Sequence, residues 1–218
     1  EEIRAVVETA ADYGSYVMAH LYTPPCMKRA VKAGVKSLEH GHWLDEETAE
    51  MIRDYGVFLD PCPQFTRKEI KWNHMDEFSD QPSQSARKDK PGAEIVRKHI
   101  EETTELINRY DLKILFGTDL MIMYNGYEPR ESLDFMEYKR RFGSYRSLVA
   151  ATGNFHELTK LTTYQNPYPQ GDVGILRKGA YADIVITSGN PAENLDILGN
   201  TENILLVMKD GIVYRNKL

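Results

Sequence analysis

A strand, a short helix and a second strand are predicted in immediate succession near the start of the chain, and this order most restricts the fold. Residues 15–19 (SYVMA) form an apolar run rich in strand formers. Residues 26–33 carry apolar side chains at helical spacing, between two prolines and Gly34. Residues 35–38 (VKSL) form a second strand. Strand, helix and strand over so short a span predict the right-handed crossover of an α/β fold, with the two strands parallel.

A histidine follows each of these strands, His20 after the first and His40 after the second. Side chains that leave the carboxyl ends of neighbouring parallel strands converge on one face, where α/β proteins build their sites. A single histidine there is more often structural than a ligand, but two at equivalent positions favour a shared role. A third apolar strand, residues 113–116 (KILF), is soon followed by Asp119. Two imidazoles and a carboxylate suit Zn²⁺ or a similar divalent ion, so a metal site is predicted.

Further helices and strands are expected along the rest of the chain. Helices are predicted at residues 1–13, 45–55, 93–110, 131–141 and 144–152, and strands at 57–60, 182–187, 204–208 and 212–214. Asp210 and Gly211 predict a hairpin turn between the last two strands. We interpret Asp183, a charge in an apolar strand, as a structural residue that bonds to turn amides. The long polar segment 64–91 follows a strand end and is a candidate lid, with a disordered loop as the alternative.

Four motifs of this sequence, in order, resemble the amidohydrolase superfamily: AHLYTP at 19–24, EHGHWLDEET at 39–48, FGTDL at 116–120 and VGILRKGAYADIVITSGNP at 173–191. Within it they are similar to the imidazolonepropionase-related metal-dependent hydrolases that include Xaa-Pro and Xaa-Arg dipeptidases. The resemblance runs nearly end to end. It implies the carboxyl-terminal half of a metal-dependent (β/α)₈ barrel (strands 5–8, residues 1–165), followed by strands of a small composite β-sandwich domain (residues 166–218).

The resemblance also implies roles for individual residues. His20, His40 and Asp119 match metal ligands, and Asp119 matches the aspartate that also serves as general base. Tyr22 matches the tyrosine that approaches the substrate carbonyl. His42 is a candidate substrate-binding residue, with a supporting position behind the ligands as its alternative. The implied cofactor is zinc or another divalent metal, with two ions in the full-length family.

The family's His-x-His pair and its lysine ligand precede the region that this sequence matches, so we expect a fragment or a truncated gene. The expected reaction is hydrolysis of an amide or peptide bond in a small molecule or dipeptide. A cyclic-amide, lactone or organophosphate hydrolase is the first alternative. A non-catalytic half-barrel that pairs with another chain is the second. For the full-length protein a homo-oligomer is expected.

Composition excludes some partners. The net charge of −6 provides no basic stripe for phosphate binding, so nucleic acid is not expected. No apolar run approaches the roughly 20 residues that a membrane span requires. The sequence leaves the location open, with the cytoplasm favoured.

Overall fold

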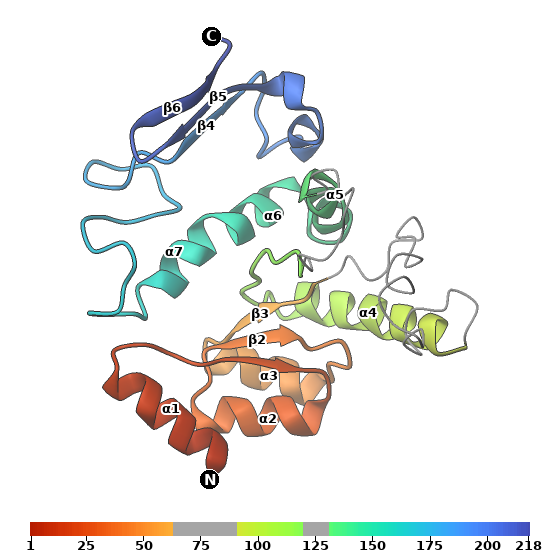
Figure 1. Ribbon diagram of the computed structural model, residues 1–218. Helices are drawn as coiled ribbons and strands as arrows, with labels where there is room; N and C mark the ends of the chain where they lie inside the picture. The colour runs from red at the N-terminus through yellow and green to blue at the C-terminus, as the bar shows by residue number, and fades with distance from the viewer. Residues whose placement is uncertain (63–90, 120–130) are drawn as a thin grey trace, which may run out of the picture.

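The computed structural model of the protein describes residues 1–62, 91–119 and 131–218, and within these it shows a mixed α/β fold with two separate β-sheets (Figure 1). The predicted lid at 64–91 lies almost wholly outside the described residues. Among the helices of the described part, none combines the length and apolar composition needed to cross a bilayer.

The first sheet is parallel and positions the candidate site. It consists of β1 (Met18–Leu21), β2 (Ser37–His40) and β3 (Phe58–Asp60), in that spatial order. Ile114 continues the sheet beyond β3 through a parallel bridge to Leu59. All carboxyl ends therefore point to one edge, as the succession of strand, helix and strand predicted.

Helices alternate with these strands: α1 (Glu2–Asp12), α2 (Pro24–Ala33), α3 (Glu46–Asp54) and α4 (Pro91–Arg109). Local signals set their ends. Gly34 closes α2 in the left-handed conformation, with φ of 99°. Asp45 caps α3, because its Oδ1 accepts a hydrogen bond from the Thr48 amide at 2.7 Å.

The core lies between the first sheet and its helices. Leu38 and Leu59, both 0% exposed, pack from the strands against side chains of α2 and α3. The members of this cluster that are fully or nearly fully buried include Met27, Ala30, Val31, Ala49, Ile52, Ile107 and Ile114. Because β2 presents Leu38 to the helices, its neighbour Glu39 faces the opposite side of the sheet.

Three further helices connect the first sheet to the second: α5 (Glu131–Phe142), α6 (Ser144–Ala151) and α7 (Gly153–Thr159). The second sheet is antiparallel, in the order β4 (Ile184–Thr187), β5 (Ile204–Lys209) and β6 (Ile212–Asn216). Two 3₁₀ helices, η3 (Leu195–Gly199) and η4 (Thr201–Asn203), precede β5. In Figure 1, α6 and α7 lie between the two sheets.

The hairpin turn and the structural aspartate are confirmed. Asp210 and Gly211 have φ of 50° and 77°, the left-handed geometry of a tight hairpin. Asp183 Oδ1 accepts a hydrogen bond from the Asp210 amide at 2.7 Å, and its Oδ2 lies 2.7 Å from Lys209 Nζ. Asp183 therefore fixes the turn.

Strand boundaries are where the sequence prediction is wrong. The first two strands begin at Met18 and Ser37, three and two residues later than predicted. The cause is helix termination: the amides of Ser15 and Val35 donate to Ala10 and Ala30 at 2.8 and 3.1 Å, so both residues belong to helix ends. The predicted strand at 113–116 is reduced to the single bridge of Ile114. The proposed domain boundary at residue 165 stays a prediction.

Candidate active site

Two histidines meet at the carboxyl edge of the first sheet. His20 is the third residue of β1 and His40 the last of β2, where it pairs with Leu21. His40 Nε2 lies 2.9 Å from His20 Nδ1, and the two ring planes are inclined at 77°. His20 is exposed, whereas His40 is 3% exposed. The sheet register therefore brings together the two imidazoles that the sequence indicated.

The backbone is left-handed at three non-glycine residues near this edge. His40, Cys62 and Asp119 have φ of 73°, 40° and 45°, and they follow or end three successive strand segments. Such a conformation costs on the order of 1–3 kcal/mol and concentrates at functional sites. This carboxyl edge of the sheet, called the rim below, thus has strained backbone after three of its four strand segments.

Tyr22 lies against both histidines. Its ring stacks on His40, with centroids 5.1 Å apart and planes 16° apart, and meets His20 edge to face at 5.0 Å. His42 and Trp43 lie 5.4 and 5.9 Å from the same ring. The two rim loops are joined through the Trp43 amide, which donates to the Tyr22 carbonyl at 3.1 Å. An aromatic wall therefore borders the histidine pair.

Burial and neighbouring charges set the protonation of this group. Burial, and after it the proximity of His20, lowers the pKa of His40, while the charge of Asp119 opposes the shift. Burial lowers the pKa of His42 to about 4. Burial raises the pKa of Tyr22, and the charge of Asp119 raises it further. At neutral pH His40 and His42 are therefore uncharged and Tyr22 keeps its proton.

Asp119 lies at the same edge, beyond the Ile114 bridge, and is exposed. Its charge acts on His40 and Tyr22. Within residues 1–62, 91–119 and 131–218, however, no three His, Cys, Asp or Glu side chains form a group that could hold a metal ion. The structure brings His20, His40 and Tyr22 into contact and places Asp119 near them. The role of Asp119 as a metal ligand stays a prediction.

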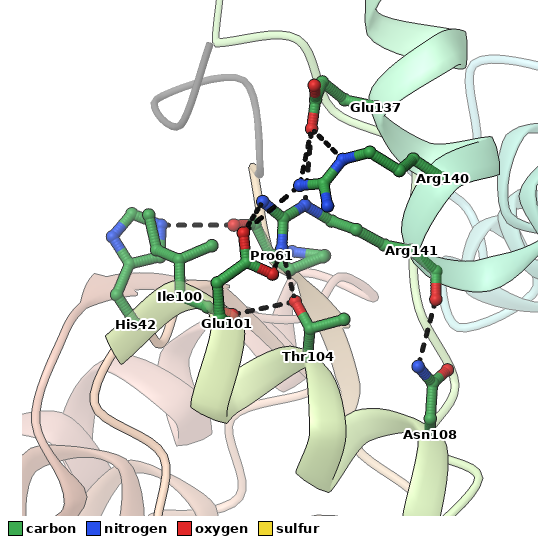
Figure 2. A network of polar contacts seen from close by, with 9 residues as sticks. All are labelled: His42, Pro61, Ile100, Glu101, Thr104, Asn108, Glu137, Arg140 and Arg141. Atoms are coloured by element: carbon green, nitrogen blue, oxygen red, sulfur yellow. Dashed lines mark hydrogen bonds and ion pairs between the residues drawn. The ribbon is translucent and has the colours of Figure 1, made fainter. Parts of the chain in front are cut away.

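His42 is buried behind the rim, with 3% of its surface exposed. Its Nε2 lies 3.1 Å from the Pro61 carbonyl, to which it donates (Figure 2). Thr103 of α4 bridges the same loop, since its hydroxyl donates to the His42 carbonyl at 2.8 Å and accepts from the Leu44 amide at 3.2 Å. His42 therefore anchors the loop after β2 to that after β3, and its substrate contact stays a prediction.

A polar network beside His42 joins α4 to α5. The Arg141 guanidinium bonds to both carboxylate oxygens of Glu101, at 2.8 and 2.9 Å, and to the Thr104 hydroxyl at 2.9 Å (Figure 2). Its side chain is 0% exposed. The network holds α5 against the helix that carries Thr103.

Sequence reasoning missed a buried group at the end of β3. Asp60 is 7% exposed, and its Oδ1 accepts from the Tyr138 hydroxyl at 2.9 Å and from the Cys62 amide at 3.2 Å. Burial raises the pKa of its carboxyl group. The strand-end rule that selected the histidines applies equally to Asp60. Tyr138 carries no such signal, because it lies on α5.

Comparison with known proteins agrees with this architecture. The model of the amidohydrolase family matches residues 1–213, and the chain belongs to this family.

Among its relatives is the ochratoxinase of Aspergillus niger, which is 26% identical over 227 residues, covering 99% of this chain and 41% of the relative. A crystal structure of an amidohydrolase matches with a TM-score of 0.79 and 30% identity, over 100% of this chain and 48% of the other. A Xaa-Pro dipeptidase with bound methionine in its active site matches with a TM-score of 0.74 and 28% identity, over 99% and 48% of the two chains. The chain thus spans about half the length of these proteins, or less.

Amidohydrolases generally use divalent metals, and imidazole nitrogens such as those of His20 and His40 are of a type that binds such ions. The His20 Nδ1 and His40 Nε2 atoms are 2.9 Å apart, at hydrogen-bond distance, so one of them carries a proton. A metal ion that bound to both nitrogens would have to displace this proton. The lowered pKa of His40 keeps it in the neutral form that a metal requires.

Proposed function

We propose that this protein is a metal-dependent hydrolase that cleaves the amide bond of a dipeptide or a comparably small substrate. The observation that carries the proposal is the pair of facing nitrogens of His20 and His40, 2.9 Å apart, with Tyr22 stacked beside them. Family membership and a Xaa-Pro dipeptidase among the structural neighbours support the reaction class.

In this proposal His20, His40 and Asp119 hold a divalent ion, with zinc favoured by two imidazoles and one carboxylate. A bound ion of this kind supplies a water molecule of lowered pKa, ready to attack a carbonyl at neutral pH. The orientation of the His40 ring is restricted by its contacts with the His20 and Tyr22 rings.

Asp119 has a second role in this proposal, as the general base. It accepts a proton from the attacking water and passes it to the nitrogen of the leaving amine, which departs as a neutral group. Because Asp119 is exposed, its carboxylate is accessible to both the water and the leaving amine. The electrostatic effect of its charge on His40 and Tyr22 supports a position next to the reacting bond.

Tyr22 is proposed to bind the substrate carbonyl. Because its pKa is raised, its hydroxyl remains protonated and can donate a hydrogen bond to the oxygen that becomes negative in the transition state. His42 packs against the same ring at 5.4 Å, and we assign it an indirect part in substrate binding, through Tyr22.

The same proposal extends to the architecture. We infer that β1, β2, β3 and the segment around Ile114 are the last four strands of a (β/α)₈ barrel within residues 1–165. The parallel order and the common carboxyl edge support this. The antiparallel β4, β5 and β6 are then part of a small β-domain within residues 166–218.

Metal content and hydrolysis, measured together, test the function. The natural gene product is loaded with Zn²⁺, dialysed and analysed by mass spectrometry, then assayed with Xaa-Pro dipeptides, a cyclic amide, a lactone and a phosphotriester. We expect bound zinc and dipeptide hydrolysis, and in His20→Ala we expect loss of hydrolysis and at least one zinc ion fewer per chain. His99→Gln is the matched control, since His99 lies on α4 and pairs with Glu102 at 3.0 Å. Undiminished zinc in His20→Ala, or hydrolysis of the cyclic amide, the lactone or the phosphotriester without the dipeptides, would contradict the proposal.

A further inference from the structure

A buried carboxylate separates the end of β3 from the segment that leads to Asp119. Asp60, the last residue of β3, is 7% exposed and accepts hydrogen bonds from the Tyr138 hydroxyl at 2.9 Å and the Cys62 amide at 3.2 Å. The Cys62 thiol lies 3.3 Å from the same oxygen. Three donor groups, two from Cys62 and one from Tyr138, therefore hold the carboxylate in one orientation.

Asp60 also touches the backbone of Gly117. A β-carbon built at this glycine would lie 1.7 Å from Asp60 Oδ2, 2.6 Å from Cγ and 2.9 Å from Oδ1. Its three nearest neighbours are thus all atoms of this one carboxyl group. Glycine is needed here because the carboxyl group of Asp60 occupies the space of a side chain.

Tyr138 holds the same segment from α5. Its side chain is 0% exposed, and its hydroxyl accepts from the Gly117 amide at 3.2 Å. The hydroxyl lies 2.9 Å from Asp60 Oδ1 and 3.0 Å from the Leu115 carbonyl, and its single proton serves one of these two acceptors at a time. Tyr138 and Asp60 together therefore contact the chain on both sides of Phe116.

We propose that Asp60 and Tyr138 are positioning residues for Asp119: by holding Leu115 and Gly117 they set where the Asp119 carboxylate stands relative to His20 and His40. The inference rests on the proposed function, which gives Asp119 its role in the reaction. Neither residue is proposed to touch the substrate.

The need for such a device follows from Asp119 itself. Its side chain is exposed and its backbone φ of 45° is unfavourable, so its position depends on how firmly the preceding residues are held. Gly117 lies two residues before it. A shift of about 1 Å in a reacting group can lower the rate on the order of 100-fold. Loss of the Tyr138 hydroxyl, which accepts a hydrogen bond from the Gly117 amide, should therefore change kcat measurably.

The first test is Tyr138→Phe, which removes the hydroxyl and keeps the ring. We expect kcat for the dipeptide to fall by about 10- to 100-fold with KM changed less than about twofold. Tyr110→Phe is the control, because Tyr110 also packs against the core but precedes Ile114 in the chain. An unchanged kcat, or an equal effect of the two variants, would overturn the proposal.

The second test separates positioning from space filling. Gly117→Ala should destabilise the protein, since its β-carbon meets Asp60, and adding Asp60→Ala should restore stability by removing the clashing atoms. If Asp60 acts by its hydrogen bonds, the double variant regains its melting temperature but not its kcat. Asp60→Asn, which keeps an acceptor for Tyr138, should retain kcat within about threefold. Recovery of kcat in the double variant would show that Asp60 only fills space.

A third measurement distinguishes failure of this inference from failure of the proposed function. Amide hydrogen exchange at Gly117, Thr118 and Asp119 should accelerate in Tyr138→Phe and stay unchanged in Tyr110→Phe, whatever the substrate is. Accelerated exchange in a protein that hydrolyses none of the substrates would leave the positioning intact and refute the function. Unchanged exchange would refute the positioning.

Discussion

The ring of Tyr22 lies parallel to that of His40, 16° from coplanar and with centroids 5.1 Å apart. The two residues belong to neighbouring strand ends, and the loops that carry them are joined by the bond from the Trp43 amide to the Tyr22 carbonyl at 3.1 Å. The Tyr22 hydroxyl is therefore held at a defined place beside the histidine pair.

The Tyr22 hydroxyl can be removed without loss of this stacking. In Tyr22→Phe we expect kcat to fall by about 100- to 1,000-fold, the usual effect of deleting one donor to the transition-state oxygen. Metal content and melting temperature should stay unchanged. Tyr55→Phe, at a residue that is 60% exposed, serves as the control. A kcat equal to that of the wild type would exclude Tyr22 from the reaction.

Asp60 should make stability depend on pH. Burial raises its folded-state pKa above the ordinary value of about 4, so the folded protein binds its proton more tightly than the unfolded chain. Its contribution to stability is full below about pH 4 and decreases as the pH rises through the raised pKa. Asp60→Asn should therefore be more stable than wild type at pH 7, with the difference vanishing near pH 4. Urea midpoints at the two pH values measure this, and a difference that grows at low pH would contradict it.

Arg141 should be a main stabilising contact between α4 and α5. Its buried guanidinium meets Glu101 and Thr104 at 2.8–2.9 Å. For Arg141→Met we expect a loss of about 2–4 kcal/mol in the free energy of unfolding. This is less than the full cost of breaking a buried ion pair, because about half of the Glu101 side chain is exposed to solvent. Lys98→Met, at the pair with Glu102 whose lysine side chain is 74% exposed, should lose less than about 1 kcal/mol in the same urea titration.

The capping aspartate of α3 should have a smaller, local effect. Asp45→Ala removes the acceptor of the Thr48 amide and should lower the free energy of unfolding by about 1 kcal/mol. Asp45→Asn, which keeps an acceptor for the Thr48 amide but removes the charge, is the matched control. Circular dichroism during chemical unfolding reports both values, and equal losses would show that charge, not capping, is at work.

Much of the parallel sheet and the histidine pair follows from local sequence. The glycine after α2 and the aspartate before α3 mark helix ends by their own backbone and side-chain chemistry. Once two strands are parallel and adjacent, residues at their ends must meet, and His20 and His40 do so at 2.9 Å. Strand starts were predicted less well, because Ser15 and Val35 bond to the preceding helices instead of the sheet.

The environment of these residues was decided by tertiary structure. The burial of His42, which donates to Pro61, depends on where the loop after β3 passes. The contact of Tyr138 with Asp60 joins residues 78 positions apart, and no periodicity or spacing marks it.

The sequence by itself thus determined which chemical groups stand at the strand ends, since period, capping and turn preference act between neighbours in the chain. Only the tertiary structure decided which of them are buried, which have shifted pKa values and which side chains contact the segment that leads to Asp119. These properties depend on side chains brought together from distant segments, where solvent is excluded and hydrogen bonds are chosen by three-dimensional packing.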